Sequence, residues 1–356
     1  MNKLKVFFLT EGTRTSAASR IRVFGYLDRL REDGRLEAKW ASFTSEAYCR
    51  NLVAGRATGP LRRVAEKLFQ AFSVLRLAFG CLTCDVVFIQ RILLPVWVQR
   101  LAAFLNSSLV YDYDDAMYLG ERGRGKRFAS QLALASRVLL VSKAAAEEAA
   151  ARRGAGPGKL VHLPSALEVA AYKSRPGSGD SQVFTVGWIG SPATTRYLEE
   201  IWEQLAAFAA SCNEVRFLFI GVRPFEVGAL SGSTRFEPWS AQAEKELLCR
   251  MDVGLMPLED DPWCRGKGGY KLIQYMAAGI ATLASPVGAN LEIVLEGRTG
   301  MFVRKPGDWA GALESLRSDR GLCRSLGRAG KQRALELYDY TVTTPVFFKT
   351  LKDAIR

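Results

Sequence analysis

The chain has 356 residues, of which 48% are hydrophobic and 24% are charged, and a formal net charge of +13. This length is enough for two domains of ordinary size. The composition is typical of a soluble globular protein. No apolar run reaches the ~20 residues that a membrane span needs. The seven cysteines show no disulfide-like pattern, and the N-terminus has no signal-peptide cleavage site. We therefore expect reduced thiols and a cytoplasmic location.

The positive charge is concentrated in the first half of the chain. Residues 1–180 hold 28 Lys and Arg against 16 Asp and Glu, whereas residues 181–356 hold 21 against 20. This asymmetry indicates an anionic partner for the first half. We expect an anionic membrane surface, on the inner face of the cell membrane, rather than nucleic acid, because the basic residues are not interleaved with aromatic residues in a stacking array.

Short apolar strands alternate with helical stretches along the first half. Helices are predicted at 20–31 and 61–79. Continuous apolar strands between helices are typical of a parallel, doubly wound sheet. The predicted strands are 5–10, 38–43, 85–90, 108–113, 138–142 and 160–163.

The predicted helix 61–79 carries an apolar stripe with basic residues on its other faces. Two alternatives are open: the helix lies in an anionic membrane interface, or its stripe packs on the sheet. The stripe consists of Leu61, Val64, Ala65, Leu68, Phe72, Leu75 and Phe79.

A polar segment rich in Gly, Ser and Pro, 170–182, is predicted to be a linker. The alternation of strands and helices restarts after it, with helices at 197–211 and 313–337 and a last short helix at 345–356. The α/β pattern predicts two Rossmann-like, doubly wound domains, 1–175 and 176–344, with the last helix as a candidate to cross back to the first domain. The strands predicted in the second half are 184–189, 215–221, 253–257, 281–284 and 300–303.

The segment 266–294, GKGGYKLIQYMAAGIATLASPVGANLEIV, combines a glycine-rich loop, a helix, a buried strand and a second helix start near Asn290. Gly279 is expected to end the first helix in the left-handed conformation. The free N–H groups at the two helix N-termini favour anions, above all phosphate. Glycines that allow close backbone approach and lysines that add charge predict a diphosphate cradle. Its residues are Lys267, Gly268, Gly269 and Lys271.

This segment resembles the donor-site signature of the retaining glycosyltransferases of family 4, closely over 266–288 and more weakly over nearly the whole chain. The resemblance implies the GT-B architecture, in which two Rossmann-like domains face each other across a cleft. It implies transfer of a sugar from a nucleotide-diphosphate sugar, without a cofactor, to a glycan or lipid-linked acceptor in surface polysaccharide or lipopolysaccharide synthesis. No metal site is expected, because helix ends and Lys or Arg stabilise the leaving group in such enzymes.

A pair of glutamates, eight positions apart in many family-4 enzymes, is absent. Aligned on the Met-Ala-Ala-Gly segment, the first position is Gly266 and the second is Gln274. The amide of Gln274 can still hydrogen-bond the ribose diol, whereas Gly266 cannot replace a carboxylate. Nearby acids at 259–261 are candidates to act instead. The absence leaves open a second function, that of a non-catalytic sugar-nucleotide-binding or assembly subunit.

Ligand contacts are predicted where the first sheet's strands end, because an open parallel sheet binds ligands beyond the carboxyl ends of its strands. The resemblance implies that the position after the strand 108–113 faces the acceptor. Asp112, Asp114 and Asp115 follow one strand and are candidates to orient an acceptor hydroxyl, with a capped helix start as the alternative. The resemblance implies that the loop before helix 20–31 faces the donor phosphates. Arg20 is expected to contact them rather than Arg22, because it lies nearer the start of the helix.

The same rule predicts donor contacts in the segments that follow the second sheet's strands. A pyrophosphate or a sugar hydroxyl fits the polar cluster in GSPATTR, with helix capping by Ser and Thr as the alternative. The resemblance places the nucleobase near FEPWS, where the alternative is that Trp239 only packs against its neighbours. The candidates are Ser191, Thr194, Arg196 and Trp239.

Overall fold

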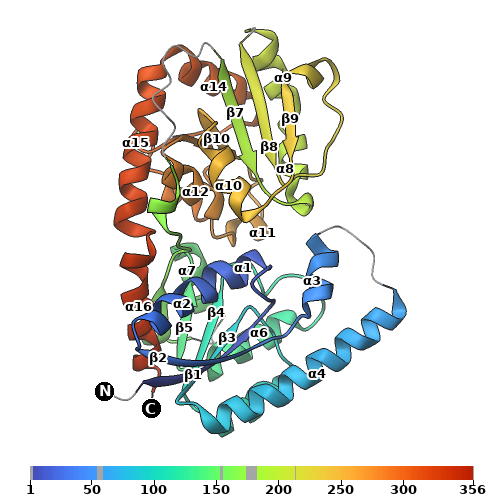
Figure 1. Ribbon diagram of the computed structural model, residues 1–356, viewed down its shortest axis with the longest axis vertical. Helices are drawn as coiled ribbons and strands as arrows, with labels where there is room; N and C mark the ends of the chain where they lie inside the picture. The colour runs from blue at the N-terminus through green and yellow to red at the C-terminus, as the bar shows by residue number, and fades with distance from the viewer. Residues whose placement is uncertain (1–2, 54–58, 153–154, 174–182, 213, 356) are drawn as a thin grey trace. The chain divides into compact units, whose positions relative to one another are not determined.

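The computed structural model describes residues 3–53, 59–152, 155–173, 183–212 and 214–355. The chain divides into two compact units, each built on a six-stranded parallel sheet (Figure 1). The first unit comprises Met1–Ala166, Arg265–Gly268 and Tyr340–Arg356, and the second comprises Leu167–Cys264 and Gly269–Asp339. Most of the predicted linker, 174–182, lies outside the described residues. Among the residues described, no helix is long and apolar enough to cross a membrane.

The first sheet confirms the predicted strands, with their ends shifted by at most two residues. The order is β2-β1-β3-β4-β5-β6, with all pairs parallel. The direction of winding therefore changes between β1 and β3, which makes a topological switch point. The strands are β1 (Leu4–Thr10), β2 (Leu36–Ser42), β3 (Val86–Gln90), β4 (Leu109–Tyr113), β5 (Arg137–Leu140) and β6 (Leu160–His162).

The helices of the first unit lie around this sheet. The predicted helix 20–31 is interrupted at its start by a turn of π-helix, η1 (Arg20–Phe24). The last helix begins at Tyr340, five residues before the predicted start, and Pro345 lies inside it. The helices are α1 (Ala17–Ser19), α2 (Gly25–Glu32), α3 (Glu46–Val53), α4 (Pro60–Thr83), α5 (Val96–Leu105), α6 (Arg124–Leu134), α7 (Lys143–Ala151) and α16 (Tyr340–Asp353).

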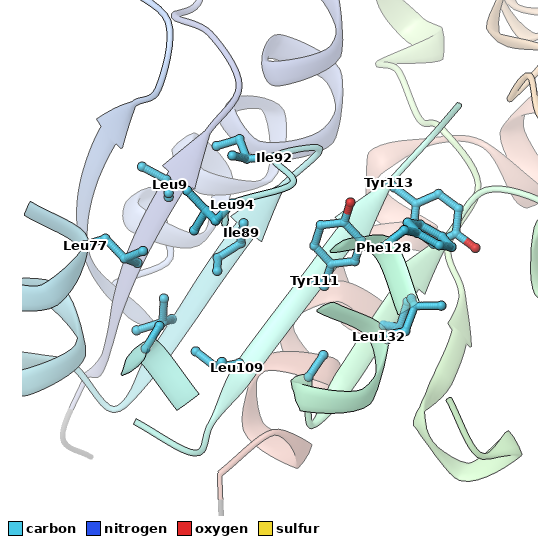
Figure 2. Close-up of a cluster of buried hydrophobic side chains, with 14 of the residues drawn as sticks. Leu9, Leu77, Ile89, Ile92, Leu94, Leu109, Tyr111, Tyr113, Phe128 and Leu132 are labelled. Carbon is cyan, nitrogen blue, oxygen red and sulfur yellow. The ribbon is translucent and has the colours of Figure 1, made fainter. Parts of the chain in front are cut away.

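Successive side chains of the buried strands point to opposite faces of the first sheet, so two apolar clusters form. One contains Leu9 and Tyr111, together with residues from α4 and α6 (Figure 2). The other contains Phe8 together with residues from α2 and α16. There the ring of Phe347 stacks on Tyr26, with centroids 4.4 Å apart, so α16 is part of the core of the first unit.

The second sheet has the order β12-β11-β10-β7-β8-β9, again with parallel pairs. Its switch point lies between β7 and β10. Five strands are confirmed, whereas β9, at the sheet edge, was not predicted because three of its four residues are polar. The strands are β7 (Phe184–Ile189), β8 (Val215–Ile220), β9 (Thr234–Glu237), β10 (Val253–Met256), β11 (Ala281–Ala284) and β12 (Met301–Phe302).

Two long predicted helices of the second half are each divided in two. The segment 197–211 contains all but the first residue of α8 and all of α9. The segment 313–337 contains the second part of α14 and all of α15, which Asp319 caps. The helices are α8 (Arg196–Glu199), α9 (Trp202–Ala210), α10 (Ala241–Leu248), α11 (Pro262–Arg265), α12 (Tyr270–Ala278), α13 (Asn290–Ile293), α14 (Trp309–Ser318) and α15 (Arg320–Leu337).

Glycines bound the helix α12 at both ends. Gly269 precedes it with φ 65°, and Gly279 ends it with φ 70°, both in the left-handed region that favours glycine. The predicted cap at Gly279 is therefore confirmed. The second predicted helix, α13, has only four residues, so its aligned peptide dipoles are few and α12 provides the stronger site for an anion.

Candidate active site

Four charged residues meet beyond the carboxyl ends of the first sheet. Glu11 follows β1, Arg91 follows β3, and Asp114 and Asp115 follow β4. The Arg91 guanidinium lies 2.7 Å from Asp115 Oδ2, 3.1 Å from Asp114 Oδ1 and 3.6 Å from Glu11 Oε2. One cation thus holds three carboxylates at the β1/β3 switch point, where doubly wound sheets bind ligands.

The backbone and the charges of this cluster are both unusual. Arg91 has φ 60°, a conformation that is uncommon for a residue other than glycine and costs about 1–3 kcal/mol. Burial acts to lower the pKa of Arg91, but its three carboxylate partners outweigh burial and raise the pKa above its ordinary value, so Arg91 stays charged. The pKa of Glu11 is raised from its ordinary value, because surrounding protein desolvates it and Arg91 only partly compensates. Glu11 retains 39% of its side-chain exposure, so it remains within reach of solvent.

The loop Arg265–Gly268 belongs to the first unit and lies against the segment that follows β4. A Cβ atom at Gly266 would come within 2.6 Å of Ala116 Cβ, and one at Gly268 would lie 3.4 Å from the Asp114 carbonyl oxygen. A larger residue at 266 would therefore displace backbone. Within this loop, the chain places Lys267 between the two glycines that pack beside the aspartates.

Asp112 occupies a different environment from Asp114 and Asp115. Its side chain has no exposed surface, and it forms an ion pair with Arg22, which is 1% exposed. Arg22 also donates to the Leu163 carbonyl oxygen at 2.7 Å. Burial raises the pKa of Asp112, and the guanidinium opposes that rise. Asp112, a predicted acceptor contact, is thus held in a buried pair, whereas Arg20 is half-buried at the start of η1.

In the second unit, the loops after β7 and β10 meet at the switch point. Arg196 Nη2 donates to the Tyr197 hydroxyl at 2.9 Å, and Cys264 Sγ donates to the same hydroxyl at 3.2 Å. Ser191 and Thr194 form a capping box, in which the Ser191 N–H donates to Thr194 Oγ1 at 3.1 Å. The two hydroxyl groups therefore also serve the capping role that was the alternative for them.

The side chain of Lys271 in α12 reaches the strand β7. Its Nζ atom lies 5.2 Å from the centroid of the Trp188 ring, within the range of a cation–π contact. This contact keeps a positive charge near the switch point of the second sheet. It also gives Trp188, which is 1% exposed, a role that the sequence pattern does not indicate.

Trp239 and Gln274 belong to a polar network rather than to an open surface. Trp239 Nε1 donates to Glu244 Oε2 at 2.7 Å, and the Tyr172 hydroxyl donates to Glu244 Oε1 at 2.6 Å. Gln274 is 4% exposed and hydrogen-bonds Tyr172. Glu244 therefore fixes the indole orientation, and it supplies a buried carboxylate that shares its partner Tyr172 with Gln274.

The residues that sequence reasoning missed are Glu11, Arg91, Tyr172 and Glu244. Glu11 and Arg91 each directly follow a predicted strand, so the carboxyl-end rule could have identified both. Tyr172 and Glu244 come from distant segments, 72 positions apart, and neither follows a strand. Their meeting is visible only in the folded chain.

Comparison with known proteins finds one family match, which covers most of the second unit. Residues 181–319 match the family model described as "Glycosyl transferases group 1". The chain contains a group 1 glycosyltransferase domain. Among curated proteins, no significant match is found.

Solved structures, among them two glycosyltransferases, share the fold of the whole chain. HepE from Anabaena in complex with UDP-glucose superimposes with a TM-score of 0.71 at 16% identity, covering 98% of this chain and 99% of that one. A glycosyltransferase from Rickettsia africae gives 0.75 at 12% identity and covers both chains fully, at 100% each. The lipopolysaccharide outer core galactosyltransferase WaaB gives 0.63 at 11% identity, covering 98% and 99%. The protein is a transferase with the two-domain GT-B fold.

Proposed function

We propose that this glycosyltransferase moves a sugar from a nucleotide-diphosphate sugar to a glycan or lipid-linked acceptor with retention of configuration, as family-4 enzymes do. The observation that carries the proposal is the glycine-bounded helix α12, which begins beyond β10 at the switch point of the second sheet, within the group 1 match. HepE, which shares the fold, was crystallised in complex with UDP-glucose, and this supports a nucleotide-sugar donor here.

The proposed donor site stabilises charge on the leaving diphosphate. As the glycosidic bond breaks, negative charge builds on the diphosphate, and only contacts that strengthen with that charge accelerate the reaction. The α12 N-terminus supplies free N–H groups, while cationic side chains supply charge without a metal or a cofactor. The residues are Arg196, Lys267, Gly268, Gly269 and Lys271, with Ser191, Thr194, Trp239 and Gln274 around the sugar and nucleoside.

The proposed acceptor site is the cluster around Arg91 in the first unit. Carboxylates that follow β1 and β4 accept hydrogen bonds from an acceptor hydroxyl, and Arg91 fixes their positions. Glu11 is the carboxylate best suited to hold a proton, because its pKa is raised. Asp112 is assigned to supporting the fold, since Arg22 and the surrounding protein cover it.

We place the reaction in cytoplasmic synthesis of a surface polysaccharide or lipopolysaccharide. The resemblance of 266–288 to family 4 and the fold shared with WaaB, a lipopolysaccharide outer core galactosyltransferase, support this role. Nucleic acid is not among the proposed partners, because the nucleotide is recognised as part of a small donor.

A second candidate function is that of a non-catalytic sugar-nucleotide binder. The glycine at 266 and the glutamine at 274 favour it, because both carboxylates of the family-4 pair are missing. Calorimetry with UDP, GDP and ADP identifies the nucleotide, and incubation with the matching nucleotide sugar then measures release of free sugar. Binding together with release supports the transferase, whereas binding without release under any acceptor condition supports the binder.

A further inference from the structure

The helix α4 presents its apolar side to solvent. Seven large apolar side chains on it are 58–86% exposed, with successive spacings of three or four residues that align them on one face. The second alternative for this helix, packing of the stripe on the sheet, is therefore wrong. These residues are Leu61, Val64, Leu68, Phe72, Leu75, Phe79 and Leu82.

The inward side of α4 packs on the sheet through Leu77 and Cys81, and specific contacts hold the helix in this orientation. The Ser45 N–H donates to Glu66 Oε1 at 3.0 Å, and Ser73 Oγ donates to the Ser42 carbonyl oxygen at 2.8 Å. Gly80 lies against the Phe7 ring, where a Cβ atom would come within 2.3 Å. These contacts oppose any rotation of α4 that would bury its apolar stripe against the sheet.

The neighbouring helix α5 adds to this surface. It packs against α4, and both helices contribute to the same apolar cluster. Trp97, Leu101 and Phe104 of α5 are 67%, 44% and 86% exposed. Large exposed apolar areas of this kind on a protein surface mark sites of interaction.

Positive charge borders the apolar residues. The described residues of α4 include one acid, Glu66, which is buried at 6% exposure. Every exposed charge on α4 is therefore a cation, and Arg100 of α5 adds another. Lys39 Nζ lies 5.6 Å from the centroid of the exposed Phe79 ring. The exposed cations of α4 are Arg62, Arg63, Lys67 and Arg76.

We propose that the exposed faces of α4 and α5 dock the protein on an anionic lipid surface, with the apolar side chains entering the acyl region and the cations contacting lipid headgroups. An amphipathic helix with a cationic border binds membranes by these two effects together. A second copy of the chain fits this surface less well, because pairing two α4 helices would bring cations against cations. The docking does not depend on the nucleotide sugar or on catalysis.

The direct test is co-sedimentation of the full chain with phosphatidylcholine vesicles that contain either no anionic lipid or about 30 mol% phosphatidylglycerol. We expect binding to the anionic vesicles at low salt. We also expect this binding to be lost when the salt concentration rises from about 0.1 M to about 1 M, because the Debye length then falls from ~10 Å to ~3 Å. Failure to bind the anionic vesicles, or equal binding to both kinds at all salt levels, overturns the proposal.

Two pairs of substitutions separate the apolar and the electrostatic effects. Phe72→Ser with Leu75→Ser lowers the vesicle partition coefficient about tenfold or more, while Leu335→Ser with Leu337→Ser, on exposed leucines of α15, leaves it unchanged. Arg62→Gln with Lys67→Gln lowers it about 30-fold, since each cation near an anionic surface contributes about fivefold. The control for charge is Arg324→Gln with Arg328→Gln on α15. Equal effects of test and control pairs overturn the assignment to α4.

Two further measurements identify the occupant of the surface. Brominated acyl chains are expected to quench the fluorescence of Trp97, and the Trp97→Phe variant should lose this quenchable component while it still binds. Analytical ultracentrifugation without lipid then tests the competing occupant. A dimer that the Phe72→Ser and Leu75→Ser pair dissociates, together with no quenching of Trp97 by lipid, would replace the lipid surface with a second copy of the chain.

Discussion

Arg91 Nη1 lies 3.6 Å from Glu11 Oε2, which joins the ends of β1 and β3 at the switch point of the first sheet. If this pair serves the acceptor, Glu11→Gln should lower kcat about 10²-fold, the lower end of what a positioned acid or base contributes. Affinity for UDP should stay unchanged, because the proposed donor contacts are elsewhere. Steady-state kinetics and calorimetry measure both, with Glu37→Gln on the exposed side of β2 as the control. Unaltered kcat would exclude Glu11.

The raised pKa of Glu11 predicts a pH dependence of stability. Between its ordinary value of 4.5 and its higher value in the folded protein, the folded state binds more protons than the unfolded state. Stability therefore falls as pH rises through this window. Glu11→Gln removes the effect, so the variant should gain stability relative to the native protein as pH rises from below 4.5 to neutrality. Urea unfolding followed over this range measures the difference, and a constant or decreasing difference would show that Glu11 is not desolvated.

The buried pair of Arg22 and Asp112 predicts a loss of stability rather than a catalytic defect. Asp112→Asn leaves the Arg22 charge buried without its counter-ion, which should lower the free energy of unfolding by about 3–5 kcal/mol. The double variant Arg22→Met with Asp112→Leu should recover most of that loss, because two apolar side chains replace both charges. Denaturant unfolding tests both variants. If the Asp112→Asn protein is as stable as the native protein but has lost turnover, Asp112 takes part in the reaction rather than in stabilising the fold.

Periodicity and strand ends were enough to predict the architecture of both sheets. Buried parallel strands read as continuous apolar runs, and this signal identified β1 and β10 alike. The same signal failed for β9, whose polar residues give a sheet edge no such run. It also left the face of α4 undecided, because an apolar stripe indicates that one side is shielded from water but not what shields it.

The site was less predictable than the fold because pairing between distant segments selects its residues. Asp112 and Asp114 are two positions apart in the sequence, yet one is buried with Arg22 and the other lies beside Arg91. A strand directs alternate side chains to opposite faces, and a residue beyond its end follows no such rule. Arg22 meets Asp112 from η1, whose π-helical turn no local pattern indicated.

Lys267 provides a separate test of the donor site. Lys267→Ala should weaken UDP binding by about 1.5–3 kcal/mol, the scale of a hydrogen bond to a charged group. Calorimetry on the folded variant measures this loss, and Lys305→Ala, at an exposed lysine that precedes α14, is the matched control. Equal affinity of both variants and the native protein would remove Lys267 from the proposed phosphate contacts.

The central claim is sugar transfer with retention, and proton NMR of the sugar released from a nucleotide sugar tests it most directly. The protein is mixed with the nucleotide sugar whose nucleotide binds in calorimetry, starting with UDP-α-glucose, and water serves as the acceptor. Spectra recorded before the anomers equilibrate should show α-glucose first, because retention preserves the donor configuration. Initial release of β-glucose would contradict retention, and tight nucleotide binding without any sugar release or transfer would contradict the assignment as a transferase.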